Sequence, residues 1–227
     1  MRKKTGMSMP VMLLSAVLVL SGCLVIKVGG PGEGQADKIS PARLSPLEQE
    51  VLKELNEART RPRQYADRIE SLLQYYRGDL FSYPGMISIR TREGVPVVQE
   101  AIRYLRKVEA MEPFRSSEGI SKAARDHVRD QGSVGSTGHY GSDRSSPFDR
   151  MKRYGQFLVT AGENIGYGPK RGDFVVMGLI IDDGVPGRGH RKNIFNKAFK
   201  VVGIACGPHR GYGTMCVIDF AGGFVEK

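Results

Sequence analysis

The sequence lacks an apolar run long enough to cross a membrane comfortably. The run VMLLSAVLVL at residues 11–20 is short, and the basic stretch MRKKTG precedes it. A basic region followed by a short apolar region is typical of a secretory signal peptide, so we expect residues 1–22 to be removed on export. The mature chain is therefore expected to act outside the cytoplasm.

The end of this signal carries a more specific pattern. Leu20, Ser21, Gly22 and Cys23 resemble a bacterial lipobox, in which the cysteine is acylated and becomes the first mature residue. The alternative is a plain cleaved signal with an incidental cysteine. The position of Cys23 favours the lipobox, which predicts a lipid anchor on a bacterial membrane. Leu24 stands where inner-membrane sorting would require an aspartate, so we expect the outer membrane or the cell surface.

Cysteine is scarce, and three is an odd count for an exported protein. With lipid on Cys23, the pair Cys206 and Cys216 remains, and it can oxidise outside the cytoplasm. Both cysteines are equidistant from Gly211, in the turn PHRGY between the β-branched runs KVVGIACG and GTMCVIDFAG. Facing positions of a hairpin bring Cβ atoms close enough to bridge. We predict a hairpin closed by a Cys206–Cys216 disulfide.

The chain also lacks a concentrated basic run. Removing Arg2, Lys3 and Lys4 with the signal lowers the formal net charge from +10 to +7. Anionic lipids or cell-wall polymers would suit such a chain as partners. The basic residues, Arg59 among them, are scattered over several predicted helices, so most are expected on solvated helix faces. No nucleic-acid-binding motif occurs, and we expect no nucleic-acid partner.

Composition divides the mature chain into a tether and a domain. Residues 23–44 are rich in Gly and Pro and predict a tether, and a domain is expected over 45–227. Ser45 and Glu48 of SPLE form a capping box that begins the first helix. Apolar residues at helical spacing predict further helices over 65–76, 97–108, 116–131, 146–154 and 173–181. Helices followed by a late hairpin predict an α+β domain rather than repeated β-α-β units.

No catalytic signature is present. The sequence has no G-x-S-x-G elbow and no H-E-x-x-H helix, and paired cysteines could not supply a thiolate. Ser142 and Ser145 lie near His139 in a stretch where helix capping is the favoured role. His127 falls on the buried stripe of its helix, where a hydrogen-bonded core histidine is favoured over a ligand.

Four segments in order resemble the bacterial branch of the CAP superfamily, the SCP-like extracellular domain. These are GHYGSDRSSPFDRMKRYG, AGENIGYG, DDGVPGRGHRKNIF and VVGIACGPHRGYGTMCVIDFAG. The resemblance extends from about Leu47 to the C-terminus. It implies a three-layer α-β-α sandwich with a central, mainly antiparallel sheet and an open groove that displays two histidines and acidic residues. In parts of the family this site holds a divalent metal.

Carried over to this sequence, His139 and His190 resemble the groove histidines, and Glu163 of GENI resembles the groove glutamate. These three are the expected ligands of Zn²⁺ or another divalent cation, since imidazole nitrogen and carboxylate oxygen suit zinc. The fourth family position is a glutamate, which is absent here, and only Asp182 and Asp183 lie in that stretch. We expect Asp183 in the groove, with the choice between the two aspartates open.

The loop DDGVPGRGHRKNIF has an alternative interpretation, in which His190 and Asp183 cap local backbone and tie the loop down. In the ligand interpretation, the glycines and Pro186 turn the chain sharply after a buried helix. His190 then enters the groove while Arg188, Arg191 and Lys192 stay outside.

The resemblance favours a monomeric binding module for a lipid, peptide or cell-envelope ligand over an enzyme. The alternative is a metal-dependent hydrolase in which Glu163 acts as base toward a metal-bound water. A third class, an adhesive surface protein, would differ in having a protein partner. Analogy at the level of the fold does not establish function, so the choice among these three classes depends on the residues of the site.

Overall fold

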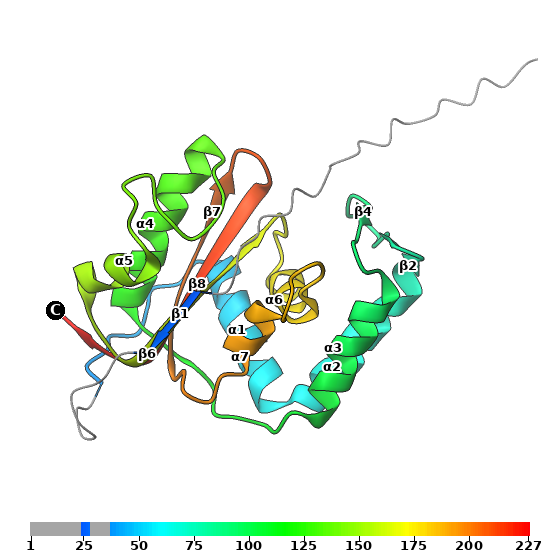
Figure 1. Cartoon of the computed structure of the whole chain (residues 1–227), viewed down its shortest axis with the longest axis horizontal. Helices are drawn as coiled ribbons and strands as arrows, with labels where there is room; N and C mark the ends of the chain where they lie inside the picture. Colours follow the sequence, from blue (N-terminus) through cyan, green and yellow to red (C-terminus); the bar gives the residue numbers. More distant parts are fainter. Residues whose placement is uncertain (1–23, 28–36) are drawn as a thin grey trace, which may run out of the picture.

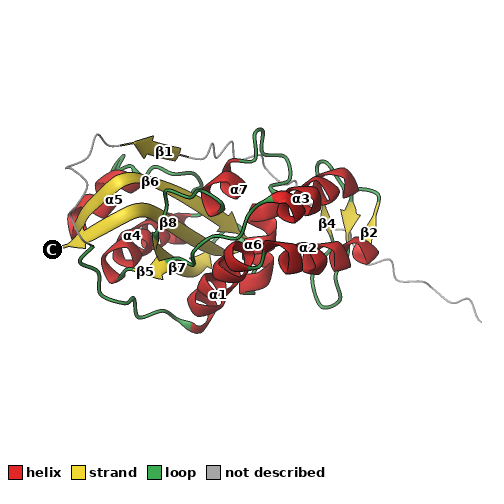
Figure 2. Ribbon diagram, turned by 90° about the horizontal axis from the view of Figure 1, so that it is seen from below, coloured by secondary structure: helices red, strands yellow, loops and turns green. Residues whose placement is uncertain are grey.

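The structure is a computed structural model that describes residues 24–27 and 37–227. Its centre is a five-stranded sheet in the order β1-β6-β8-β7-β5, antiparallel except for the parallel pair β5 and β7 (Figure 2). The strands are β1 (Leu24–Lys27), β5 (Arg115–Ser116), β6 (Gly155–Tyr167), β7 (Val201–His209) and β8 (Gly213–Glu226). The predicted signal peptide and Cys23 lie outside the described residues.

Helices cover both faces of this sheet. One face carries α4 (Glu118–Val134) and α5 (Pro147–Tyr154). The other carries α1 (Pro46–Thr60), α6 (Gly172–Ile181) and the short α7 (Gly189–Ile194). The predicted α+β class and three-layer sandwich are confirmed (Figures 1 and 2).

A helical hairpin projects from one end of the sandwich (Figure 1). It contains α2 (Pro62–Glu70), the 3-10 helix η1 (Ser71–Tyr75), β2 (Tyr76–Arg77), β3 (Leu80–Phe81), β4 (Ile89–Arg90) and α3 (Val95–Lys107). The helix predicted through Tyr76 is therefore too long, since α2 ends at Glu70 and the chain continues through η1 into a small second sheet, ordered β2-β3-β4.

Local capping chemistry begins α1 and α5 where the sequence predicts. Ser45 and Glu48 form the capping box of α1, and Ser146 and Asp149 form a second one at α5. Each box is followed by proline at the first helical position, where its missing N–H costs no hydrogen bond. These helix starts need no tertiary contact to define them.

The predicted hairpin is β7 and β8, with Cys206 directly opposite Cys216 and joined to it by a disulfide. This prediction is confirmed. The long strand β6 was not predicted, because it is buried on both faces for most of its length and shows no alternation of apolar and polar residues.

The predicted tether is wrong for the residues that the structure describes. Leu24–Lys27 form β1 at the edge of the sheet, paired with β6. Residues 37–44 run along the domain, where Asp37 accepts a hydrogen bond from the backbone N–H of Phe224 and Lys38 bridges to Val225. Within the described residues, no helix combines the length and apolar character needed to cross a membrane.

Candidate functional site

Strand β6 organises the candidate site because two adjacent residues, Glu163 and Asn164, project to opposite faces of the sheet. Glu163 contacts residues of the α4–α5 side, and Asn164 contacts residues of α7. Both side chains are fully buried. Each anchors a different histidine-bearing segment to the same strand.

On the α4–α5 side, His139 and Glu163 are in contact. His139 Nδ1 lies 2.6 Å from Glu163 Oε1, and Arg150 Nη2 of α5 donates to Glu163 Oε2 at 2.7 Å. Arg150 Nη1 also donates to the carbonyl oxygen of His139 at 3.1 Å. Glu163 thus holds the His139 ring while Arg150 holds both Glu163 and the His139 backbone.

Asp219 of β8 is a fourth member of this cluster that sequence reasoning missed. It lies opposite Glu163 in the β6–β8 register and is fully buried. Burial, together with the charge of Glu163, raises the pKa of Asp219 well above its usual range, and burial likewise raises the pKa of Glu163 against the opposing effect of Arg150. The two carboxyl groups therefore favour sharing a proton. An aspartate inside the apolar run CVIDFAG was the signal available.

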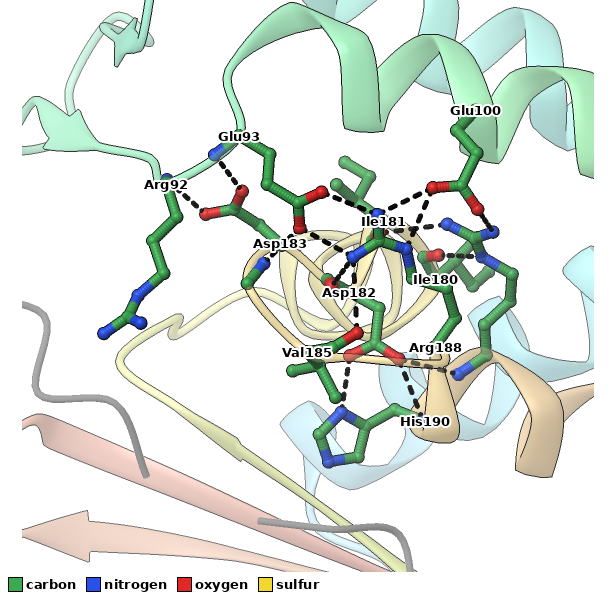
Figure 3. Close-up of polar contacts among 12 residues, drawn as sticks. Arg92, Glu93, Glu100, Ile180, Ile181, Asp182, Asp183, Val185, Arg188 and His190 are labelled. Carbon is green, nitrogen blue, oxygen red and sulfur yellow. Dashed lines mark hydrogen bonds and ion pairs between the residues drawn. The ribbon is translucent and has the colours of Figure 1, made fainter. Parts of the chain in front are cut away.

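On the other side, His190 is held by Asp182. His190 Nδ1 lies 2.7 Å from Asp182 Oδ1, and the His190 backbone N–H donates to Asp182 Oδ2 at 2.9 Å (Figure 3). Asp182 ends α6 in the left-handed region, with φ of 60°. The side chain of His190 is buried, and its Nε2 has no hydrogen-bond partner among the described residues.

Asp183 does not contact either histidine. Its carboxylate accepts hydrogen bonds from the backbone N–H groups of Arg92 and Glu93, at 2.7 and 2.8 Å (Figure 3). The expectation that Asp183 belongs to the groove set is corrected, because the left-handed turn at Asp182 directs the two neighbouring carboxylates to different partners. Asp182 is the residue that orients His190.

Two of the three basic residues expected outside are buried or half-buried. Arg191 donates to the carbonyl oxygens of Ile180 and Ile181 at the end of α6, and it pairs with Glu100 of α3 at 2.7 Å. Arg188 is half-buried and pairs with Glu93 and Glu100. The last carbonyls of α6 lack helical partners, and the buried guanidinium of Arg191 supplies the donors. Lys192 is exposed, as expected.

His127 and Ser142, for which a structural role was favoured, have hydrogen-bond partners that fit such a role. His127 is fully buried and its Nε2 lies 2.8 Å from the carbonyl oxygen of Gly138, which fits a core histidine. Ser142 hydrogen-bonds Asp130 through its hydroxyl. Two surface clefts, with volumes of about 640 Å³ beside α3 and about 280 Å³ beside α4, are lined by other residues than His139, Glu163 and His190.

The predicted three-ligand metal set does not fit this arrangement, because both oxygens of Glu163 are engaged, by His139 and Arg150. Within residues 24–27 and 37–227, no group of three or more His, Cys, Asp or Glu side chains is placed to hold a metal ion. The contacts of Glu163 fit the role of a partner that orients the His139 ring. A carboxylate bonded to one ring nitrogen of a histidine fixes the ring, so that the other nitrogen can meet a ligand or a cation.

Comparisons with known proteins match the chain to a family model and to one curated relative. The model of the cysteine-rich secretory protein family (CAP) matches residues 99–220. An uncharacterized protein of Bacillus subtilis (strain 168), YkwD, is 35% identical over 107 residues, which are 47% of this chain and 40% of the relative. The chain therefore spans less than half the length of that curated relative.

Two solved structures are more distant. An extracellular protein containing an SCP domain from Bacillus anthracis is 21% identical, with a TM-score of 0.40 over 55% of this chain and 37% of its own. An outer surface protein from Borrelia burgdorferi is 16% identical, with a TM-score of 0.41 over 58% of this chain and 88% of its own.

Proposed function

Because the chain belongs to the cysteine-rich secretory protein (CAP) family, we propose that it is an extracytoplasmic binding module, held to a membrane by lipid on Cys23. Its ligand is a lipid, a peptide or a component of the cell envelope. The observation that carries the proposal is the pair of histidines oriented by carboxylates, His139 by Glu163 and His190 by Asp182.

The proposed location rests on features outside the site. Export is supported by the signal-like residues 1–22, and the lipobox that ends at Cys23 supports anchoring to the outer membrane or the cell surface. The Cys206–Cys216 disulfide suits an oxidising compartment. These features do not depend on what the site binds.

At the site, an imidazole with one nitrogen fixed by a carboxylate presents its other nitrogen in a set direction. His190 Nε2 is such a group, and the backbone of His190 is held to β6 because Asn164 donates to its carbonyl oxygen at 3.0 Å. A buried, oriented polar group of this kind discriminates between ligands, since an unmatched buried polar group costs about 1–3 kcal/mol.

We propose no cation shared by His139 and His190, because the adjacent residues Glu163 and Asn164 direct the two histidine segments to opposite faces of the sheet. The hydrolase alternative gains no support, because Glu163 is fully buried and both its oxygens are engaged. We therefore propose binding and not hydrolysis.

The test is mass spectrometry of molecules that copurify with the protein from its native envelope. We expect a lipid or envelope component with the wild-type chain, retained by Lys192→Ala on the exposed side of α7 and lost from His190→Ala. Equal recovery from the wild type and His190→Ala, with both folded by circular dichroism, would contradict the proposal.

A further inference from the structure

The first described residues close one edge of the central sheet. Leu24–Lys27 pair antiparallel with β6 in a register that sets Leu24 opposite Glu163 and Lys27 opposite Thr160. Glu163 is the residue that orients His139. Strand β1 therefore lies directly beside the part of β6 that carries the candidate site.

The fit of β1 is specific and not a loose edge contact. Leu24 and Ile26 are half-buried and pack against the apolar cluster between the sheet and α4–α5. The hydroxyl of Thr160 donates to the carbonyl oxygen of Ile26 at 2.6 Å. An added Cβ at Gly162 would lie 2.9 Å from Phe199 Cζ and 3.3 Å from the Leu24 carbonyl oxygen, so β6 is closely packed on both sides at this position.

The outer side of the same edge is partly apolar and exposed. Val25 is 41% exposed and Val159 is 57% exposed. Val159 also has φ of 67°, a left-handed conformation that β-branched residues rarely adopt. Lys27 adds an exposed positive charge. Exposed apolar side chains can enter the headgroup region, and a lysine is attracted to anionic lipid.

We propose that this edge, formed by Val25, Lys27 and Val159, rests on the membrane that anchors the protein. The inference rests on the proposed acylation of Cys23. Leu24 is covalently bonded to Cys23, and consecutive Cα atoms are about 3.8 Å apart, so no spacer separates a lipidated Cys23 from the sheet. This edge of β6 then lies next to the bilayer, and the ligand of the protein is a lipid of that membrane.

The experiment uses the full acylated chain in vesicles of phosphatidylethanolamine and phosphatidylglycerol that contain nitroxide-labelled phosphatidylcholine. A fluorophore is attached to Val159→Cys, and the matched control carries it on Ile87→Cys, an exposed apolar position near β4 on the projecting hairpin. We expect the nitroxide to quench the label at residue 159 several-fold more strongly than the label at residue 87.

A second protein carries a flexible Gly-Ser spacer between Cys23 and Leu24, and it should lose the extra quenching at residue 159 while keeping its lipid. Equal quenching at residues 159 and 87, with acylation of Cys23 confirmed by mass spectrometry, would overturn the membrane contact and leave the anchor intact. An unmodified Cys23 would overturn both the anchor and this contact.

Discussion

Arg150 and Glu163 form a buried ion pair. The two side chains are almost completely buried and 2.7 Å apart. Removing one partner of a buried pair leaves the other charge without compensation and costs about 3–5 kcal/mol. Arg150 therefore secures the orientation of His139 as well as the stability of the domain.

We predict that Arg150→Ala lowers the free energy of unfolding by about 3–5 kcal/mol, measured by urea denaturation at neutral pH. Lys152→Ala, an exposed change on the same helix, should stay within about 0.5 kcal/mol of the wild type. A loss for Arg150→Ala as small as that of the control would show that the pair contributes little.

His127 should make the domain sensitive to acid. Burial lowers the pKa of His127 to about 4, since the charged imidazole is disfavoured inside the protein. Its contribution to stability is thus fully present above its usual pKa of about 6.5 and is lost as the pH falls toward about 4. The full effect is on the order of 3 kcal/mol.

His127→Gln keeps an N–H donor for the Gly138 carbonyl but cannot gain a charge in this range. We expect the wild type to lose more stability than His127→Gln between neutral pH and pH about 4, as measured by urea midpoints. The comparison isolates His127, because Glu163 and Asp219 change protonation in both proteins. Parallel pH profiles would contradict the prediction.

Helix α1 is joined to the loop after α7 by Arg59. Its guanidinium donates to the carbonyl oxygens of Glu112, Ile194 and Phe199, at 2.8, 2.7 and 3.2 Å, and lies 3.9 Å from the centre of the Phe114 ring. Arg59 is fully buried, so the expectation of a solvated helix face is wrong at this position. These buried carbonyl oxygens need hydrogen-bond donors, and the side chain of Arg59 supplies them from inside the protein.

Arg59→Ala should lower the free energy of unfolding by about 3 kcal/mol or more, because several buried carbonyls lose their donor. Arg61→Ala, at the exposed residue that ends α1, is the matched control and should change stability by less than about 0.5 kcal/mol. Chemical denaturation of both variants gives the comparison. A near-neutral Arg59→Ala would mean that water replaces the guanidinium.

The β7–β8 hairpin should survive loss of its disulfide in weakened form. The bridge closes a short loop, with a sequence separation of 10, so its removal should cost about 2–3 kcal/mol. Thermal unfolding with and without reductant measures this loss, and circular dichroism should show the fold retained. Two free thiols titrated in the exported protein before reduction would show that the bridge does not form.

In the complete fold, the two histidine segments contact the same strand from opposite faces of the sheet. We therefore expect that His139 and His190 do not share a zinc ion, so His139→Ala and His190→Ala should not both abolish zinc binding in a calorimetric titration. Loss of all binding in both folded variants, with Lys192→Ala binding as the wild type does, would contradict this placement.

Local chemistry in the sequence was sufficient to predict the starts of α1 and α5 and the β7–β8 hairpin. Ser45, Glu48 and Ser146 cap through neighbours a few residues away, and Cys206 and Cys216 face each other across a short turn. The resemblance to the family also identified His139, Glu163 and His190 as candidate site residues. It did not predict which residues each of them contacts. The helix starts and the hairpin can be predicted because their partners are close in the chain.

The contacts between distant segments depend on the complete fold. The pairing of β6 with β8 places Asp219 opposite Glu163. A left-handed turn at Asp182 makes this residue, and not Asp183, the partner of His190. Arg191 is buried because it donates to the carbonyl oxygens at the end of α6. The fold also pairs Leu24–Lys27 with β6, where composition predicts a tether. In each case the deciding energy is the desolvation of a charge or a backbone group, which depends on what the fold brings beside it and not on the neighbouring residues in sequence.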